Sequence, residues 1–142
     1  MTRVMASGVF DIIHAGHISY LEQAKSYGDE LYVVVACDET VRRKKHEPIT
    51  PDVMRARIVG SLKPVDRAIV GNDGDMFATV REIMPDVIVI GFDQNFDLDE
   101  LRSRLDERGL GQIRVVRADE CADDLNATRR IVAKIRRMGD SQ

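Results

Sequence analysis

Two glycines and two histidines near the N-terminus are the residues of this chain best suited to phosphate chemistry. The segment Gly8–His17 reads GVFDIIHAGH, with His14 and His17 three residues apart. A strand-like apolar run, Val4–Ala6, precedes it, and a helix-like run begins at Ile18. A strand–helix junction presents unpaired backbone N–H groups and the positive end of a helix dipole, which attract phosphate. Imidazoles can donate hydrogen bonds to phosphoryl oxygens, so the segment predicts phosphate handling in an α/β nucleotide-binding fold.

Apolar and amphipathic segments alternate along the chain and predict the elements that must position this motif. Strands are expected at Val4–Ala6, Leu31–Ala36, Ala68–Val70, Val87–Ile90 and Ile113–Val116. Helices are expected at Ile18–Tyr27, Glu39–Lys44, Asp52–Ser61, Met76–Met84, Leu98–Arg108 and Asn126–Met138. This order favours a doubly wound parallel sheet of five strands with helices on both faces. Ligands of such sheets collect at the carboxyl ends of the strands, where Gly8–His17, Asp38 and Gly91–Asp97 fall.

Length and composition limit the classes of protein that this chain can be. Its 142 residues, 44% hydrophobic and 32% charged, predict a single soluble domain spanning 1–142. A net charge of −3 implies no general affinity for nucleic acid, and no apolar run approaches the roughly 20 residues of a membrane span. The N-terminus runs directly into the first strand, so no signal peptide is expected. Cys37 and Cys121 form no CxxC pair, which favours the reducing cytoplasm.

The motif resembles the G-x-F-D-x-x-H-x-G-H signature of the cytidylyltransferase-type nucleotidyltransferases. Every fixed position is met, by Gly8, Phe10, Asp11, His14, Gly16 and His17. Further matches to the family are Asp38, Lys44-Lys45 before Pro48-Ile49, Arg55 before the stretch 62–66, and Pro85–Gly91 leading into Asp93. The resemblance covers nearly the whole chain up to about Val116. It implies a Rossmann-like fold, usually in a homodimer.

Within this family the chain is most similar to the small archaeal-type FAD synthases. The similar segments are Gly28–Leu31, Ala36–Val41, Leu62–Ile69 and Gly91–Asp97. Glycerol-3-phosphate cytidylyltransferases tend to carry an acidic residue and a tryptophan around the last of these segments, and this chain has no tryptophan. The resemblance implies transfer of AMP from ATP to FMN. Alternatives are a cytidylyltransferase using CTP and glycerol 3-phosphate, a sugar-phosphate nucleotidyltransferase, and a non-catalytic nucleotide-binding module.

The implied reaction is in-line attack by a substrate phosphate on the α-phosphorus of the nucleotide. A phosphomonoester is already anionic near neutral pH, so catalysis needs positioning and charge stabilisation rather than a general base. The resemblance assigns His14 and His17 to the triphosphate, with backbone N–H groups around Gly8, Val9 and Phe10 completing the cradle. Mg²⁺ would neutralise the triphosphate. A zinc site on the two histidines lacks a third ligand other than Asp11, so no metal held by the protein alone is expected.

The resemblance also assigns roles to charged residues farther along the chain. Lys44 and Arg55 are expected to be catalytic, although whether Lys44 or Lys45 contacts the phosphates stays open. Asp93 and Gln94 are expected at the nucleotide, and Asp11, Asp38, Lys45 and Asp97 at the acceptor substrate. Tyr20, Phe92 and Phe96 are the aromatic candidates for an acceptor platform.

The start of the last helix departs from the family pattern. The family carries an I-S-[ST]-[ST] stretch there, which binds the triphosphate, whereas this chain reads LNATRR from Leu125 to Arg130. Only Thr128 keeps a hydroxyl. We expect Asn126, Thr128 and Arg129 to contact the nucleotide, with the guanidinium supplying charge where hydroxyls are missing.

Overall fold

The computed structural model describes residues 1–121 and 127–140, and its centre is one parallel β-sheet. The strands are β1 (Arg3–Gly8), β2 (Glu30–Val35), β3 (Arg67–Val70), β4 (Val87–Ile90) and β5 (Arg114–Arg117). Their order in the sheet is β3-β2-β1-β4-β5, and every neighbouring pair is parallel. The expected five-stranded, doubly wound sheet in a single domain is confirmed.

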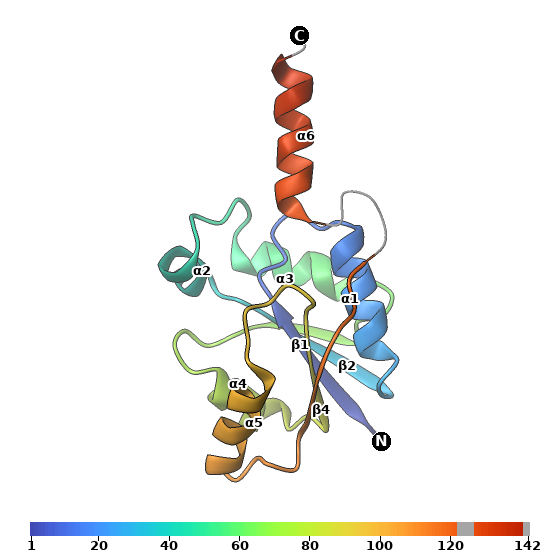
Figure 1. The fold of residues 1–142 in the computed structure, drawn as a ribbon, viewed down its shortest axis with the longest axis vertical. Coiled ribbons are helices and arrows are strands. Elements are labelled where there is room, and N and C mark those ends of the chain that lie inside the picture. The colour runs from blue at the N-terminus through green and yellow to red at the C-terminus, as the bar shows by residue number, and fades with distance from the viewer. Residues whose placement is uncertain (122–126, 141–142) are drawn as a thin grey trace.

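Helices cover both faces of this sheet (Figure 1). The helices are α1 (Ala15–Lys25), α2 (Asp38–Lys44), α3 (Asp52–Gly60), α4 (Met76–Ile83), α5 (Leu98–Glu107) and α6 (Thr128–Asp140). Side chains of α1 and α3 share one core cluster with the sheet, and those of α4 and α5 share the other. Helix α6 projects away from the body and buries none of its side chains. None of the helices in the described part of the chain is long and apolar enough to cross a membrane.

The central strands are apolar on both sides because each face of the sheet is covered. In β1, Val4 and Ala6 point into the cluster under α1 and α3, whereas Met5 points into the cluster under α4 and α5. The same alternation places Val89 with the first cluster and Ile88 with the second. Two-sided burial explains the continuous apolar runs in the sequence.

Two details of the helices differ from the sequence prediction. Helix α1 begins at Ala15, three residues before the predicted start, because the side chain of His14 caps it. It ends at Lys25, with Ser26 as its C-cap, and so before the predicted end at Tyr27. Gly28 lies against the sheet, where an added Cβ would be 2.7 Å from the carbonyl oxygen of Thr2. Close backbone approach, not helix termination, therefore accounts for this glycine.

Candidate functional site

Two cavities open at the carboxyl edge of the sheet, one toward each face. The first, which we call the motif cavity, has a volume of about 440 Å³ and is lined by Gly8–Ile12, His14 and His17 together with the start of α6. The second, the α4–α5 cavity, has a volume of about 970 Å³ and is lined by α2, α4, α5 and the loops after β3 and β4. The residues that line both are Ser7, Gly8, Val9, Lys45, Asp93 and Gln94. The two cavities therefore meet at the end of β1.

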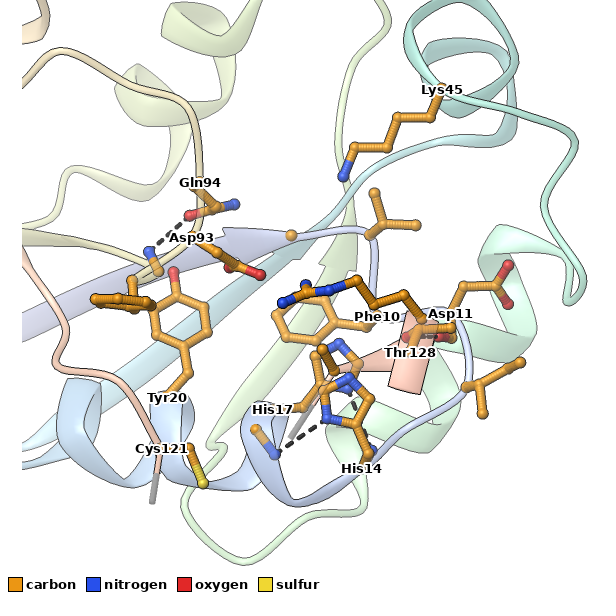
Figure 2. Close-up of a pocket in the computed structure, with 18 of the residues that line it drawn as sticks. Phe10, Asp11, His14, His17, Tyr20, Lys45, Asp93, Gln94, Cys121 and Thr128 are labelled. Carbon is orange, nitrogen blue, oxygen red and sulfur yellow. Dashed lines mark hydrogen bonds between the residues drawn. The ribbon is translucent and has the colours of Figure 1, made fainter. Parts of the chain in front are cut away.

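His14 and His17 hold each other through reciprocal backbone hydrogen bonds at the start of α1 (Figure 2). The N–H of Gly16 donates to Nδ1 of His14 at 3.0 Å, and the N–H of His14 donates to Nδ1 of His17 at 3.2 Å. The two rings stack with their centroids 3.8 Å apart. Because each Nδ1 accepts, each neutral ring carries its proton on Nε2. Helix capping thus leaves two Nε2–H donors for a ligand.

The environment keeps both imidazoles neutral. Burial lowers the pKa of His14, and the carboxylate of Asp93 opposes this only partly. Burial, reinforced by repulsion from His14, lowers the pKa of His17 to about 4. Both rings are therefore uncharged near pH 7 without a ligand, and they act as neutral hydrogen-bond donors.

The backbone between β1 and α1 is strained where it lines the motif cavity. Phe10 and Ile12 have φ angles of 56° and 61°, in the left-handed region that non-glycine residues rarely adopt. Each such residue costs about 1–3 kcal/mol, and such strain gathers at functional sites. The ring of Phe10 is buried and would lie 3.0 Å from a Cβ added at Gly8. The ring of Phe10 is therefore part of the core, whereas its backbone lines the motif cavity.

The carboxylate of Asp11 is bonded to the protein itself. It accepts from the N–H of Ile49 at 2.7 Å, from the N–H of Thr50 at 3.1 Å and from the Thr50 hydroxyl at 2.8 Å. Burial raises the pKa of Asp11, but these donors outweigh it and hold the pKa below its usual value. Asp11 lines the motif cavity, but its carboxylate, which we expected at the acceptor substrate, is occupied by these three bonds, which anchor the segment before α3.

Arg55 does not line either cavity, contrary to the catalytic role that we expected. Its side chain is fully buried and donates to the carbonyl oxygens of Val9 at 2.7 Å, Ala36 at 2.8 Å and Thr50 at 2.9 Å. It also pairs with Asp38 at 2.7 Å, and Asp38 lines neither cavity. Both residues hold the ends of β1 and β2 in place rather than reaching a ligand.

The two lysines after β2 lie at the cavities, where a cation can pair with a phosphate group. Lys45 lines both cavities, and Lys44 lines the α4–α5 cavity alone. Figure 2 shows Lys45 across the pocket from the histidine pair, with its ammonium end pointing inward. The structure thus places Lys45 between the two cavities.

The loop after β4 brings the remaining acidic and amide candidates to the site. Asp93 is exposed on the wall shared by both cavities. Gln94 accepts from the N–H of Gly91 at 2.7 Å and donates to the carbonyl of Ser7 at 3.0 Å. Asp97 lines the α4–α5 cavity, but its Oδ1 caps α5 by accepting from the N–H of Asp99 at 2.9 Å. Gln94 and Asp97 therefore fix the loop, and Asp93 is the member exposed toward a ligand.

One positioning residue, Arg117, was missed by the sequence prediction, and another, Tyr20, was expected in a different role. Arg117, at the end of β5, donates to the carbonyl oxygens of Gly91, Gln94 and Phe96 and so clamps the loop that carries Asp93. The hydroxyl of Tyr20 accepts from the N–H of Ser7 at 3.1 Å and donates to the carbonyl of Val89 at 2.6 Å. Tyr20 therefore bridges β1 and β4 and is not an acceptor platform. For Arg117, the only feature of the sequence that could have indicated its role is its position at the end of a strand.

The first turn of α6 closes the motif cavity. The hydroxyl of Thr128 donates to the carbonyl of Asp11 at 3.3 Å, and Thr128 and Arg129 line the cavity. Asn126 lies outside the described residues. The start of α6 is thus hydrogen-bonded to the segment Gly8–His17.

Comparison with known proteins identifies relatives over most of the chain. A family model described as cytidylyltransferase-like matches residues 5–134. The FAD synthase of Aciduliprofundum boonei is 52% identical over 136 residues, which is 95% of this chain and 91% of that protein. The FAD synthase of Thermoplasma acidophilum is 50% identical over 135 residues, 95% of this chain and 94% of that one.

Solved structures agree on the fold. A protein of Thermoplasma volcanium described as a lipopolysaccharide core biosynthesis protein superposes with a TM-score of 0.83 at 49% identity, covering 85% of this chain and 98% of that one. A protein of unknown function from Archaeoglobus fulgidus superposes with a TM-score of 0.67 at 17% identity, covering 83% and 90%, and supports the fold alone.

Proposed function

The chain belongs to the cytidylyltransferase-like family, and we propose that it is an FAD synthase, which transfers AMP from ATP to FMN. Relatives named FAD synthase, 50–52% identical over 95% of the chain, support FMN as the acceptor. The observation that carries nucleotidyl transfer is the histidine pair, whose Nε2–H donors lie beside a strained phosphate-binding turn. This function matches the expectation from the motif.

The two cavities divide the two substrates between them. ATP occupies the motif cavity, where the Nε2–H groups of His14 and His17 and the backbone near Gly8 face its phosphates. FMN occupies the α4–α5 cavity, with its phosphate near Lys44 and Lys45. The substrates meet at the end of β1, which both cavities share.

The transfer step is an in-line displacement. An oxygen of the FMN phosphate bonds to the α-phosphorus of ATP, the bond from that phosphorus to the bridging oxygen breaks, and pyrophosphate leaves with the electron pair. Neutral donors fixed in place stabilise the charge that spreads over the transferring group without reorganising. His17 is the main donor to this group, and Lys45 neutralises the attacking phosphate.

The remaining lining residues orient the nucleotide. Asp93 faces the ribose or base, while Thr128 and Arg129 contact the triphosphate from the start of α6. A Mg²⁺ ion held by the triphosphate itself would neutralise its charge; the carboxylate of Asp11 is already bonded to three protein donors. The proposed assembly is a homodimer and the proposed compartment the cytoplasm.

The test is pyrophosphate release by the purified protein with Mg²⁺, crossing ATP and CTP against FMN and glycerol 3-phosphate. We expect release with ATP and FMN, together with FAD as the product. Release only with CTP and glycerol 3-phosphate would make the chain a cytidylyltransferase of the same fold. Tight nucleotide binding with no release for any pair would make it a binding module.

A further inference from the structure

The α4–α5 cavity changes character along its length. At the strand ends it is lined by glycines and by Lys44 and Lys45, which suit a phosphate. Between α4 and α5 it is lined by the apolar side chains Met76, Phe77, Phe96 and Leu101, together with charged side chains of α5 and its ends, among them Glu100 and Arg104. A ligand that fits both ends carries a phosphate at one end and a flat, largely apolar group at the other. FMN has this form, with its isoalloxazine ring at the far end.

Arg108 stands at that far end in an arrangement suited to a flat ligand. Its guanidinium carbon lies 4.1 Å from the centroid of the Phe77 ring, a cation–π contact. Its Nη1 donates to the carbonyl oxygen of Arg104 at 3.0 Å, which anchors the side chain at the end of α5. Phe77 is itself buried, with 8% of its surface exposed. The guanidinium is therefore held by a rigid ring below it and by one backbone bond.

The donors of Arg108 are only partly used within the protein. Neighbouring Arg104 pairs with Glu100 at 2.7 Å, whereas Arg108 forms no ion pair within residues 1–121 and 127–140. A guanidinium offers five N–H donors in a fixed planar fork. Held at a cavity wall, it recognises a planar group with neighbouring acceptor atoms. The pyrimidine edge of isoalloxazine, with its carbonyl oxygens and ring nitrogens, is such a group.

We infer that Arg108, held on Phe77, determines flavin specificity by donating hydrogen bonds to the pyrimidine edge of the isoalloxazine ring. This inference rests on the proposed function and adds the residue that selects the acceptor. The ring packs against Met76 and Phe96, and the phosphate extends toward Lys44. Arg108 contacts the ring alone, so its contribution is independent of the phosphate.

Binding of FMN and of riboflavin, followed by flavin fluorescence without ATP, tests this assignment. Riboflavin carries the same ring and lacks the phosphate. We expect Arg108→Gln to weaken both ligands by about tenfold, the loss of a charged donor to a neutral acceptor. Lys44→Gln should weaken FMN alone. Arg81→Gln, an exposed arginine on α4 that lines neither cavity, should change neither.

Several results would overturn the inference. Weakening of FMN alone by Arg108→Gln would mean that Arg108 contacts the phosphate, and unchanged binding of both ligands would mean that it contacts neither. Full binding by Arg108→Lys would show that charge suffices without the planar fork. If the wild-type protein forms FAD and the Arg108→Gln protein binds both flavins normally, only this inference is overturned. A wild-type protein that binds neither flavin and forms no FAD overturns the proposed function with it.

Discussion

The two cavities on either side of β1 are built in different ways. The imidazole and backbone N–H donors of the motif cavity come from one continuous segment, Gly8–His17, and the histidines are fixed by backbone hydrogen bonds. The α4–α5 cavity is lined by side chains from several elements, among them exposed cations such as Lys44 and Arg108. The motif cavity therefore presents preorganised backbone and fixed imidazoles, whereas the α4–α5 cavity presents a set of long side chains.

This difference follows the task of each cavity. Charge develops at the nucleotide phosphates during transfer, and donors that are already oriented stabilise it without a reorganisation cost. The acceptor must instead be selected by shape and by a few polar contacts, for which side chains between two helices are suited. Changes in the motif cavity should therefore act on kcat, and changes in the α4–α5 cavity on the KM for FMN.

The largest effect is expected where one residue supports both cavities. Arg55→Met keeps the apolar stem of the side chain but leaves Asp38 and the carbonyls of Val9 and Ala36 without their donor. Removing one partner of a buried ion pair costs about 3–5 kcal/mol. We expect a fall of this size in the free energy of unfolding, measured in urea.

The matched control for this substitution is Arg57→Met on the same helix. Arg57 is exposed, so its replacement should change the unfolding free energy by no more than about 0.5 kcal/mol. Equal stability of the Arg55→Met and Arg57→Met proteins would show that the buried arginine does not hold the strand ends together.

A smaller and more local effect is expected from His17. His17→Ala removes an Nε2–H donor from the motif cavity, and loss of one such donor costs about 2.7–4 kcal/mol of barrier, or about 10²–10³ in kcat. Steady-state kinetics should show this fall with the KM for FMN nearly unchanged. His17→Gln keeps a neutral N–H donor and should retain more activity than His17→Ala. If the Gln and Ala proteins were equally slow, a neutral donor would not be what the step requires.

The sequence was sufficient for the fold and for the motif cavity because both depend on local patterns. The apolar run Val87–Ile90 predicted β4 with its observed bounds, since a strand covered on both faces needs apolar side chains throughout. The histidines of the motif were correctly placed beside the turn because a strand–helix junction fixes the position of its own backbone.

The partners of charged side chains could not be predicted in the same way. Arg55 and Asp11 were expected at the ligand, yet they bond to Val9, Ala36, Ile49 and Thr50. Arg117 and Arg108 were not singled out at all. Most of these contacts join segments that are distant in the chain or depend on how two helices pack, and spacing in the sequence does not determine which acceptor a long side chain reaches.

The smallest effect, and the one that isolates the motif cavity, is a dependence of stability on pH. The pKa of His17 is lowered to about 4 in the folded protein, mainly by burial, whereas an unfolded histidine has a pKa near 6.5. Between these values the unfolded chain binds a proton that the folded protein does not. The contribution of His17 to the free energy of unfolding is therefore fully present above about pH 6.5. It falls by about 1 kcal/mol per pH unit as the pH decreases toward 4.

Urea unfolding of wild type and His17→Gln at pH 7, 6 and 5 measures this contribution. The difference in unfolding free energy between the two proteins should shift in favour of the variant as pH falls, because glutamine does not titrate. No histidine is among the described residues that line the α4–α5 cavity, so Arg108→Gln should follow the wild-type curve. Parallel curves for wild type and His17→Gln would mean that His17 is not held neutral by burial, and its role as a neutral donor would lose its basis.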